Sequence, residues 1–255
     1  MIDGPIYTKL ITACSERGAG FLLLLDPDRV SREVYLPLAE AAADCGVDAI
    51  LVGTSFMLDG DFATSVKEIK QISPVPVIIF PGSYAQICPS ADAILFTSLL
   101  SGRNPSYLID EQVKGAPIIK RCNLETIPTG YLLIESGPLT SVQYISGTLP
   151  IPRSKNDIAC AHALAAQYLG MKLVYLEAGS GAEWPVSVEM VEAVSSYVDI
   201  GIIVGGGLRT PSDCEARVKA GASFVVIGSG LECEPDPELM REFGAAIHYK
   251  EKVTA

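Results

Sequence analysis

Short apolar segments recur along the chain, each bounded by glycine, proline or aspartate and followed by hydrophobic residues at helical spacing. This alternation is typical of repeated strand–helix units with buried parallel strands. Eight such segments are present, at residues 21–25, 49–52, 77–80, 93–96, 131–134, 173–176, 200–204 and 224–227. Eight units in 255 residues predict an α/β protein built as a single (β/α)8 TIM barrel, rather than an open doubly wound sheet.

The stretches between these segments predict the helices. Ser31 and the pair Thr210-Pro211 are helix start signals. Residues 115–129 and 136–154 are longer than ordinary connections and are expected to be insertions that shape one end of the barrel. No second domain is needed, so residues 1–255 form one predicted domain. The predicted helices span residues 32–45, 62–72, 105–113, 156–169, 186–197, 211–220 and 235–248, with a weak one around 84–88.

The composition and charge of the chain argue against several classes of function. Hydrophobic residues make up 49% and charged residues 19% of the chain, which argues against disorder. The net charge of -11 argues against nucleic acid as a partner, and scattered Lys and Arg residues allow at most a peripheral membrane contact. Neither a secretory signal nor a spanning segment of about 20 apolar residues is apparent, so we expect a cytoplasmic protein. Seven cysteines form no CxxC pair and are interpreted as reduced.

The residues that directly follow each apolar segment carry the chemical signal, because a TIM barrel builds its active site at the carboxyl ends of its strands. Glycines are dense after the sixth, seventh and eighth segments, in residues 177–182, 205–207 and 228–230. Glycine lets backbone N–H groups approach an anion, and a following helix would add its positive dipole end. Each cluster alone is equally well explained as a tight turn. Together, late in the barrel, they predict a phosphate site.

Carboxylates are expected at the same end of the barrel. Asp26 and Asp28 flank a proline directly after the first segment, and turn formation or helix capping is the competing explanation, more so for Asp28. Mg²⁺ needs only one or two protein oxygens, so Asp26 with a hydroxyl from Thr54 or Ser55 would suffice. Glu177 ends an apolar strand, where it is either a structural ion-pair partner or a general base for a substrate hydroxyl.

Several of these segments together resemble the geranylgeranylglyceryl phosphate synthase family. The resemblance runs through nearly the whole chain, and the stretch YLEAGSGA at residues 175–182 is its most specific part. The other matching segments are LDPDR at residues 25–29, GTS at 53–55, VGGGLR at 204–209 and IGS at 227–229.

The resemblance implies a Mg²⁺-dependent prenyltransferase that joins geranylgeranyl diphosphate to the C3 hydroxyl of sn-glycerol 1-phosphate, in ether phospholipid biosynthesis. It implies Asp26 and Ser55 as metal ligands and Glu177 as the catalytic group. Related bacterial heptaprenylglyceryl phosphate synthases have a lysine two positions before the metal-binding aspartate, where this chain has Leu24, which favours the geranylgeranyl branch. By position, glycerol 1-phosphate would be held by Tyr175, Leu176, Glu177, Ala178, Gly179, Ser180, Gly181, Gly206, Gly207, Gly228 and Ser229.

A prenyl tail also requires an apolar trench, and the third and fourth units supply candidates for it. Core packing explains each of these residues equally well. Basic or polar side chains at positions 103, 104, 153 and 155 could face the diphosphate, although solvated surface is the simpler explanation for each. The trench candidates are Phe80, Tyr84, Ile87, Phe96, Leu99, Leu100 and Tyr107.

Two other functions fit the barrel without the resemblance. One is an isomerase or synthase that acts on a phosphorylated small molecule, which would have a compact polar pocket and no long apolar groove. The other is a phosphate-binding barrel without catalysis, against which Asp26 and Glu177 argue. The family resemblance also implies a homo-oligomer, either dimer or hexamer. The sequence sets neither that choice nor the prenyl length.

Overall fold

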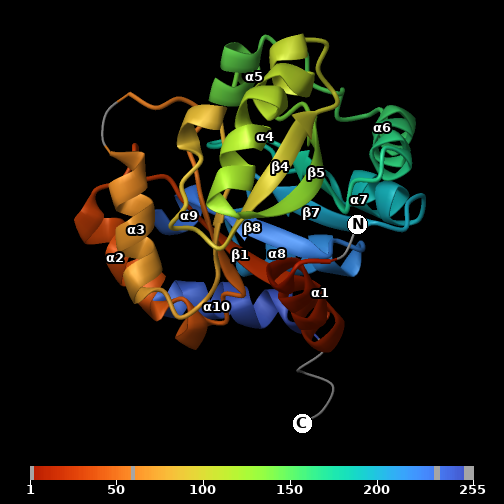
Figure 1. The fold of residues 1–255 in the computed structure, drawn as a ribbon. Coiled ribbons are helices and arrows are strands. Elements are labelled where there is room, and N and C mark those ends of the chain that lie inside the picture. Colours follow the sequence, from red (N-terminus) through yellow and green to blue (C-terminus); the bar gives the residue numbers. More distant parts are fainter. Residues whose placement is uncertain (1–2, 59–60, 233–235, 250–255) are drawn as a thin grey trace.

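The computed structural model describes residues 3–58, 61–232 and 236–249, and its centre is a closed barrel of parallel strands (Figure 1). Each strand pairs with the next along the chain, and β8 closes the barrel against β1 with Gly20 opposite Phe224. The prediction of a (β/α)8 barrel is therefore confirmed. The strands are β1 Gly20–Leu25, β2 Ala49–Val52, β3 Val77–Ile79, β4 Ala93–Leu99, β5 Glu125–Leu133, β6 Leu173–Glu177, β7 Gly201–Gly205 and β8 Phe224–Ile227.

Helices surround the barrel (Figure 1). Helix α8 begins where the start signal predicts it, because the Thr210 side chain accepts the Asp213 N–H and the Asp213 side chain accepts the Thr210 N–H. The helices after β1 are α2 Arg32–Ala41, α3 Phe62–Ile72, α4 Glu111–Cys122, α5 Ser141–Ser146, α6 Asn156–Tyr168, α7 Val188–Ser195, α8 Pro211–Lys219, α9 Ser229–Glu232 and α10 Pro237–Ile247, with short turns η1 Ala43–Cys45, η2 Tyr84–Gln86 and η3 Ser106–Asp110.

The first helix, α1 (Pro5–Arg17), was not predicted. Its Leu10 is buried among the inward-facing residues of the strands, which places α1 across the amino-terminal end of the barrel. Glu125, the first residue of β5, accepts the backbone N–H groups of Ile6 and Tyr7 at 2.9 and 2.8 Å, so it satisfies donors that the helix cannot pair itself. This end of the barrel is closed, and a ligand must enter at the other end.

The third strand–helix unit lacks a full helix. Between β3 and β4 the described chain forms only the single turn η2, although a weak helix was predicted around residues 84–88. Helix α4 of the next unit packs against η2 and β4 instead. The outer layer of the barrel is therefore incomplete beside β3 and β4.

The prediction of an insertion at residues 115–129 is wrong. Helix α4 continues through Gly115 and Pro117 to Cys122, and β5 then begins at Glu125 and passes through Pro128 and Gly130. Glycine and proline normally interrupt such elements, which explains the error. Gly115 packs closely against η2, since a Cβ there would lie 3.0 Å from Ile87 Cδ1.

The second predicted insertion, residues 136–154, extends beyond the barrel. It contains α5 and ends near Ile151, which forms an isolated bridge to Ile134 after β5. Helix α5 lies beyond the end of β4 and β5 (Figure 1). The loop therefore extends the side of the barrel beyond the carboxyl ends of the strands, where the site was predicted.

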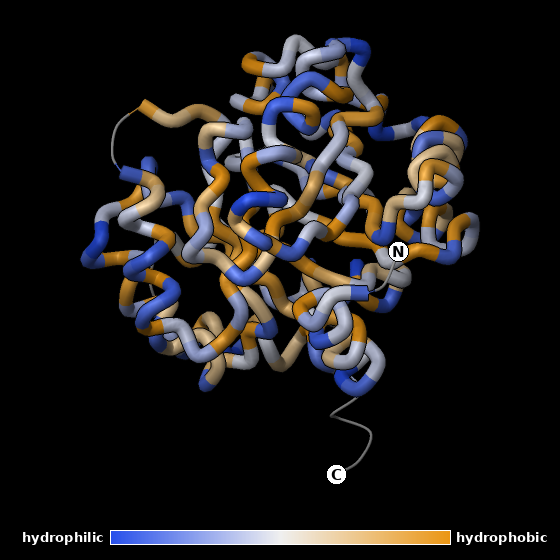
Figure 2. The backbone as a smooth tube through the Cα atoms, viewed as in Figure 1, coloured by the Kyte–Doolittle hydropathy of each residue, from blue (hydrophilic) through white to orange (hydrophobic). Residues whose placement is uncertain are grey.

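The core has two layers. Alternate residues of each strand point outward to the helices, as Phe21, Leu23 and Leu25 do, or inward, as Leu22 does. Figure 2 shows hydrophobic residues along the central strands and mixed residues on the surrounding helices. Both faces of the strands are thus buried, as a parallel barrel requires.

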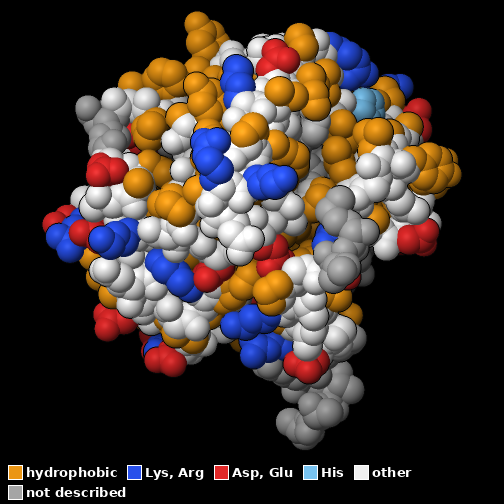
Figure 3. Space-filling model, viewed as in Figure 1, with side chains coloured by type: hydrophobic (Ala, Val, Ile, Leu, Met, Phe, Trp, Pro, Cys, Tyr) orange, Lys and Arg blue, Asp and Glu red, His pale blue; other side chains and the backbone are white. Residues whose placement is uncertain are grey.

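No helix in the described ranges is long and apolar enough to cross a membrane. Lys and Arg side chains on the face in Figure 3 are interspersed with hydrophobic and acidic ones.

Six cysteines are free thiols, at positions 14, 45, 88, 122, 160 and 214, and the seventh, Cys233, lies outside the described residues.

Candidate active site

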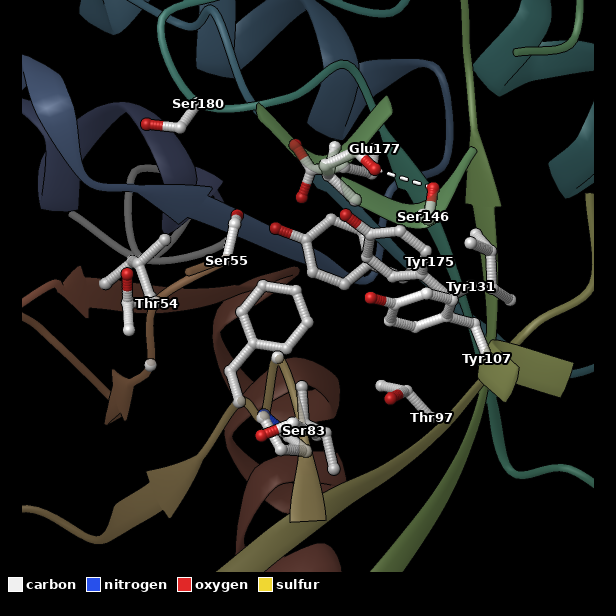
Figure 4. A pocket seen from close by; sticks show the side chains of 18 of the residues that line it. Thr54, Ser55, Ser83, Thr97, Tyr107, Tyr131, Ser146, Tyr175, Glu177 and Ser180 are labelled. Carbon is white, nitrogen blue, oxygen red and sulfur yellow. Dashed lines mark hydrogen bonds between the residues drawn. The ribbon is translucent and has the colours of Figure 1, made fainter. Parts of the chain in front are cut away.

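A single large cavity opens at the carboxyl end of the barrel. Its volume is about 1430 Å³, part of it open solvent, and residues of β4 and α4 form its outer part. Figure 4 shows some of the side chains that line it. Residues from the ends of β1, β2, β6, β7 and β8 form its polar part. Glu177, Asp26 and Ser55 all line it, so the predicted carboxylates and hydroxyl share one cavity with the glycine turns.

The loops after β1 and β2 supply the oxygen donors of the predicted metal site. Asp26 is 9% exposed, and its Oδ1 accepts the Asp28 N–H at 3.1 Å. Burial raises the pKa of Asp26, although hydrogen bonds and nearby Arg29 partly oppose that rise. A cation beside Asp26 would favour its charged form. The Ser55 side chain is exposed at the same rim, whereas the Thr54 hydroxyl donates to Phe56 O at 3.2 Å.

Two residues hold these loops in place, and only one was singled out from the sequence. Asp28 accepts the Leu58 N–H, at 3.2 and 3.1 Å to its two oxygens, which ties the first loop to the second. Gln86 is 2% exposed, donates to Thr54 O at 2.9 Å and accepts the Gly82 N–H at 3.0 Å. Asp28 is therefore structural, and no sequence signal pointed to Gln86.

Glu177 is the central buried acid of the cavity. It is 5% exposed, and its Oε1 accepts the Gly179 N–H at 2.6 Å. Burial raises its pKa, while the Gly179 N–H and the hydroxyls of Tyr175 and Tyr131 lower it. The pKa values of both tyrosines are raised well above their ordinary range by burial and then by Glu177, so both remain neutral donors. No ion pair of Glu177 occurs among the described residues, so the structural ion pair that was the alternative explanation is not found there.

Glycines allow the loops after β6 and β7 to meet at Glu177. Gly206 has φ +79°, and a Cβ there would lie 2.5 Å from Glu177 Oε1 and 2.6 Å from Gly179 N. A Cβ on Gly205 would lie 2.3 Å from the Tyr175 hydroxyl. These distances are below any real contact, so the absence of side chains is what permits this arrangement.

Gly206→Ala should reduce turnover by about 100-fold, because the new methyl must displace the Glu177 carboxylate. The matched control is Gly170→Ala, which shares the φ of +79° but has nothing within 4 Å of its Cβ. In both variants alanine must adopt a positive φ, which costs roughly 1 kcal/mol or more in stability. Thermal unfolding measures the loss of stability from this strain, and steady-state kinetics measure the loss of turnover. Equal activity of the two variants would contradict this account of Gly206.

The predicted phosphate cradle is partly assembled. Ser180, Gly206, Gly207, Gly228 and Ser229 line the cavity. The other predicted contacts, Leu176, Ala178, Gly179 and Gly181, do not: the side chains of Leu176 and Ala178 point outward into the helix-facing core. Tyr175 lines the cavity floor, and its buried hydroxyl lies beside Glu177 without forming a hydrogen bond of normal geometry to any described residue.

The expectation that each following helix directs its dipole at the cradle is wrong for two of the three turns. Helix α7 begins only at Val188, well after the β6 turn, and the amino end of α8 is capped by Thr210 and Asp213. Arg29 provides positive charge instead, since it donates from the β1 loop to the Ser180 hydroxyl. The sequence analysis predicted no role for Arg29, although its position directly after Asp28 places it at the carboxyl end of β1.

The apolar part of the cavity agrees with most of the predicted trench. Six of the seven trench candidates line it, together with Ile94 and Ile119, but Leu100 packs into the outer core. In Figure 4, Thr97 and Tyr107 lie on the side away from Ser180 and Thr54. An elongated apolar groove is the feature that a compact-pocket isomerase would lack.

The four candidates for diphosphate contacts do not line the cavity. Arg103 donates to Gly102 O at 2.7 Å and Arg153 to Pro185 O, while Asn104 donates to Ser146 O at 2.8 Å. Lys155 precedes α6 and is exposed. Arg103 therefore bonds within its own loop, whereas Asn104 and Arg153 join their loops to other segments.

Comparisons with known proteins agree with this geometry. The model of the PcrB family matches residues 12–246. Geranylgeranylglyceryl phosphate synthase of Thermococcus kodakarensis is 48% identical over 242 residues, covering 94% of this chain and 93% of that protein. The protein of the same name from Spirosoma linguale is 45% identical over 232 residues, covering 89% and 93%.

One solved structure has nearly the same fold. It is (S)-3-O-geranylgeranylglyceryl phosphate synthase from Thermoplasma acidophilum in complex with sn-glycerol-1-phosphate, with a TM-score of 0.89 and 35% identity. The match covers 97% of this chain and all of that chain. The chain therefore belongs to the PcrB family, together with these geranylgeranylglyceryl phosphate synthases.

Proposed function

We propose that this protein is a prenyltransferase that forms an ether bond between the C3 hydroxyl of sn-glycerol 1-phosphate and geranylgeranyl diphosphate, releasing diphosphate. One observation carries the proposal. A single cavity joins a rim of oxygen donors at Asp26 and Ser55, a buried carboxylate at Glu177 with glycine turns around it, and an elongated apolar groove. Family membership and the relatives that carry this name support the same reaction.

The glycine turns are the proposed site of glycerol 1-phosphate. Gly206, Gly207, Gly228 and Ser229 line this part of the cavity, and their backbone N–H groups are the proposed donors to phosphate oxygens. Arg29 brings a cation to Ser180 at the edge of the turns. Glu177 then lies where it can accept a hydrogen bond from a glycerol hydroxyl. The Tyr175 hydroxyl, which is buried beside Glu177, would donate to the same substrate.

Mg²⁺ is the proposed cofactor, held by Asp26 and Ser55. One carboxylate and one hydroxyl suit an ion that fills its remaining positions with water and substrate oxygens. The burial that raises the pKa of Asp26 would be offset by such an ion. When bound, Mg²⁺ supplies neutralisation of the negative charge on the departing diphosphate.

The chemical step transfers the prenyl group from diphosphate to the glycerol oxygen. The bond between the allylic carbon and the diphosphate oxygen breaks, and its electron pair leaves with diphosphate. A lone pair of the glycerol C3 oxygen forms the new ether bond to that carbon, and its proton passes to Glu177. Asp26 and Glu177 follow or end different strands, β1 and β6, and line the same cavity, so the two proposed substrates would meet between them.

Product analysis tests the function directly. Purified protein is incubated with Mg²⁺, either enantiomer of glycerol phosphate, and allylic diphosphates of several chain lengths, and lipids are identified by mass. We expect an ether lipid from the 1-phosphate enantiomer and the C20 diphosphate. An isomerase or a binding protein would give no ether product with any pair.

Arg29→Ala should raise the KM for glycerol 1-phosphate by roughly 10-fold or more, because one charge-assisted contact to phosphate is lost. The KM for the prenyl diphosphate should change less. Arg29→Lys should recover part of the affinity, and the matched control Arg32→Ala removes an exposed arginine that pairs with Glu68. An unchanged KM in Arg29→Ala would exclude Arg29 from the phosphate site.

Assembly as a homo-oligomer and a cytoplasmic location stay predictions. Analytical ultracentrifugation of the purified protein would test the first, and fractionation of cells that express it the second.

A further inference from the structure

The aromatic side chains at the base of the cavity form one packed group. Phe80 stacks on Tyr175 with ring centroids 5.2 Å apart and an angle of 22° between the planes. Tyr131 meets the edge of this pair, at 5.5 Å from Tyr175 and 5.9 Å from Phe80. All three residues line the cavity. We call Phe80, Tyr131 and Tyr175 the aromatic triad.

Only one ring of the triad has substantial free surface. Tyr175 is fully buried and Tyr131 is 8% exposed, whereas Phe80 is half-buried. One face of Phe80 is covered by Tyr175 because the two rings stack. Its remaining exposed surface is therefore presented to the cavity that it lines.

The backbone holds Phe80 between the two halves of the site. Phe80 directly follows β3, and its N–H donates to Val52 O at 2.9 Å. A Cβ on Gly53 would lie 1.8 Å from Phe80 O, so the β2 loop that carries Ser55 passes in close contact. On the other side, Phe80 stacks on Tyr175, two residues before Glu177 on the same strand. Phe80 thus lies between the proposed metal rim and the proposed base.

We infer that Phe80 is a catalytic residue, whose free ring face stabilises the positive charge that develops on the allylic carbon as the diphosphate departs. This inference rests on the proposed function. As the carbon–oxygen bond breaks, its electron pair leaves with diphosphate and the allyl group becomes electron-poor until the glycerol oxygen supplies a lone pair. The face of an aromatic ring attracts a cation through its quadrupole. Within the described ranges no Lys or Arg side chain lines the cavity, and the proposed cations, Arg29 beside Ser180 and Mg²⁺ at Asp26, belong to its polar rim.

The test changes the electronics of Phe80 while keeping its shape. Phenylalanine analogues with one, two and three ring fluorines are incorporated at position 80 of the full-length protein, because each fluorine weakens the quadrupole with little change in volume. Single-turnover rates of ether formation are measured with saturating substrates. We expect the logarithm of the rate to fall linearly along the series, by about 10-fold in total, with the KM for glycerol 1-phosphate unchanged.

Phe96 provides the matched control. It is also a half-buried phenylalanine that lines the cavity, but it comes from β4 in the apolar groove. The same fluorinated series at position 96 should leave the rate unchanged. A flat series at position 80, or equal declines at both positions, would overturn the role of Phe80. If the unmodified protein forms no ether product, the proposed function itself fails and the inference fails with it.

A second readout separates stabilisation of charge from simple packing. A prenyl diphosphate with fluorine at C2 develops the same charge less readily, so its rate in the unmodified protein should drop. If Phe80 stabilises that charge, an α-secondary deuterium isotope effect at C1 should change along the position-80 series. An unaltered isotope effect accompanied by a raised KM for the prenyl diphosphate would assign Phe80 to binding alone and overturn the inference.

Discussion

Glu177→Gln is expected to abolish ether formation without destabilising the barrel. Gln keeps the size of the side chain and can still accept the Gly179 N–H, so the turn after β6 should persist. It cannot accept the proton of the glycerol hydroxyl. Loss of a positioned general base typically lowers the rate by about 10²–10⁴-fold. The KM for glycerol 1-phosphate should change little, since the phosphate contacts remain.

The same change should preserve or raise stability at neutral pH. Burial raises the pKa of Glu177 in the folded protein above its unfolded value, so the folded state favours the protonated acid. The contribution of Glu177 to the free energy of unfolding is complete when the pH lies below its pKa in the unfolded chain. It is lost as the pH rises through its pKa in the folded protein. Above that pH the native protein holds a buried charge, which Gln removes.

Thermal unfolding across a pH series, together with product assays, checks both expectations. The difference in melting temperature between Glu177→Gln and wild type should be zero or positive at pH 8 and should shrink toward acid pH. The matched control is Glu192→Gln on the exposed side of α7, which should change neither quantity. An active Glu177→Gln enzyme would rule out Glu177 as the base.

Asp26→Asn is expected to weaken binding of Mg²⁺ with diphosphate and to remove most activity. The amide is close to isosteric and its oxygen can still accept the Asp28 N–H, so the loop should keep its shape. It lacks the charge that would hold the ion. We expect affinity to fall by at least about 10- to 100-fold, because even indirect disturbance of a metal site has an effect of this size.

Calorimetry with Mg²⁺ and inorganic diphosphate measures this loss without relying on turnover. Asp44→Asn is the matched control, because Asp44 is an exposed aspartate in η1, away from the cavity. Ser55→Ala should give a smaller loss than Asp26→Asn, since a neutral donor is removed. Retained affinity in Asp26→Asn would place the ion elsewhere.

The barrel was predictable because its strands are buried on both faces and stand out as apolar segments. The pattern of apolar segments missed parts of the fold where glycine and proline, which usually end helices and strands, lie inside an element. Gly115 and Pro117 suggested that the fourth helix ends early, but the helix continues through both, with Gly115 packed closely against Ile87. Pro128 and Gly130 similarly concealed the first half of β5. Helix α1 covers the barrel with few buried residues and so left a weak signal.

The site was predictable where a residue type follows a strand directly. Asp26, Ser55 and Glu177 meet in one cavity because parallel strands end at the same side of the barrel. Contacts formed by long side chains across loops could not be predicted, since spacing along the chain does not indicate them. Arg29 reaching Ser180, and Gln86 joining two loops, are of this kind.

The incomplete outer layer beside β3 and β4 has a thermodynamic consequence. In the free protein the groove next to η2 leaves apolar side chains such as Tyr84 in contact with water, with Tyr84 42% exposed. A bound hydrocarbon chain would supply the contacts that a third helix makes in a regular barrel, so ligand and scaffold share one hydrophobic core. Folding and lipid uptake are then linked equilibria, and the resistance of the protein to unfolding should track the concentration of its own substrate.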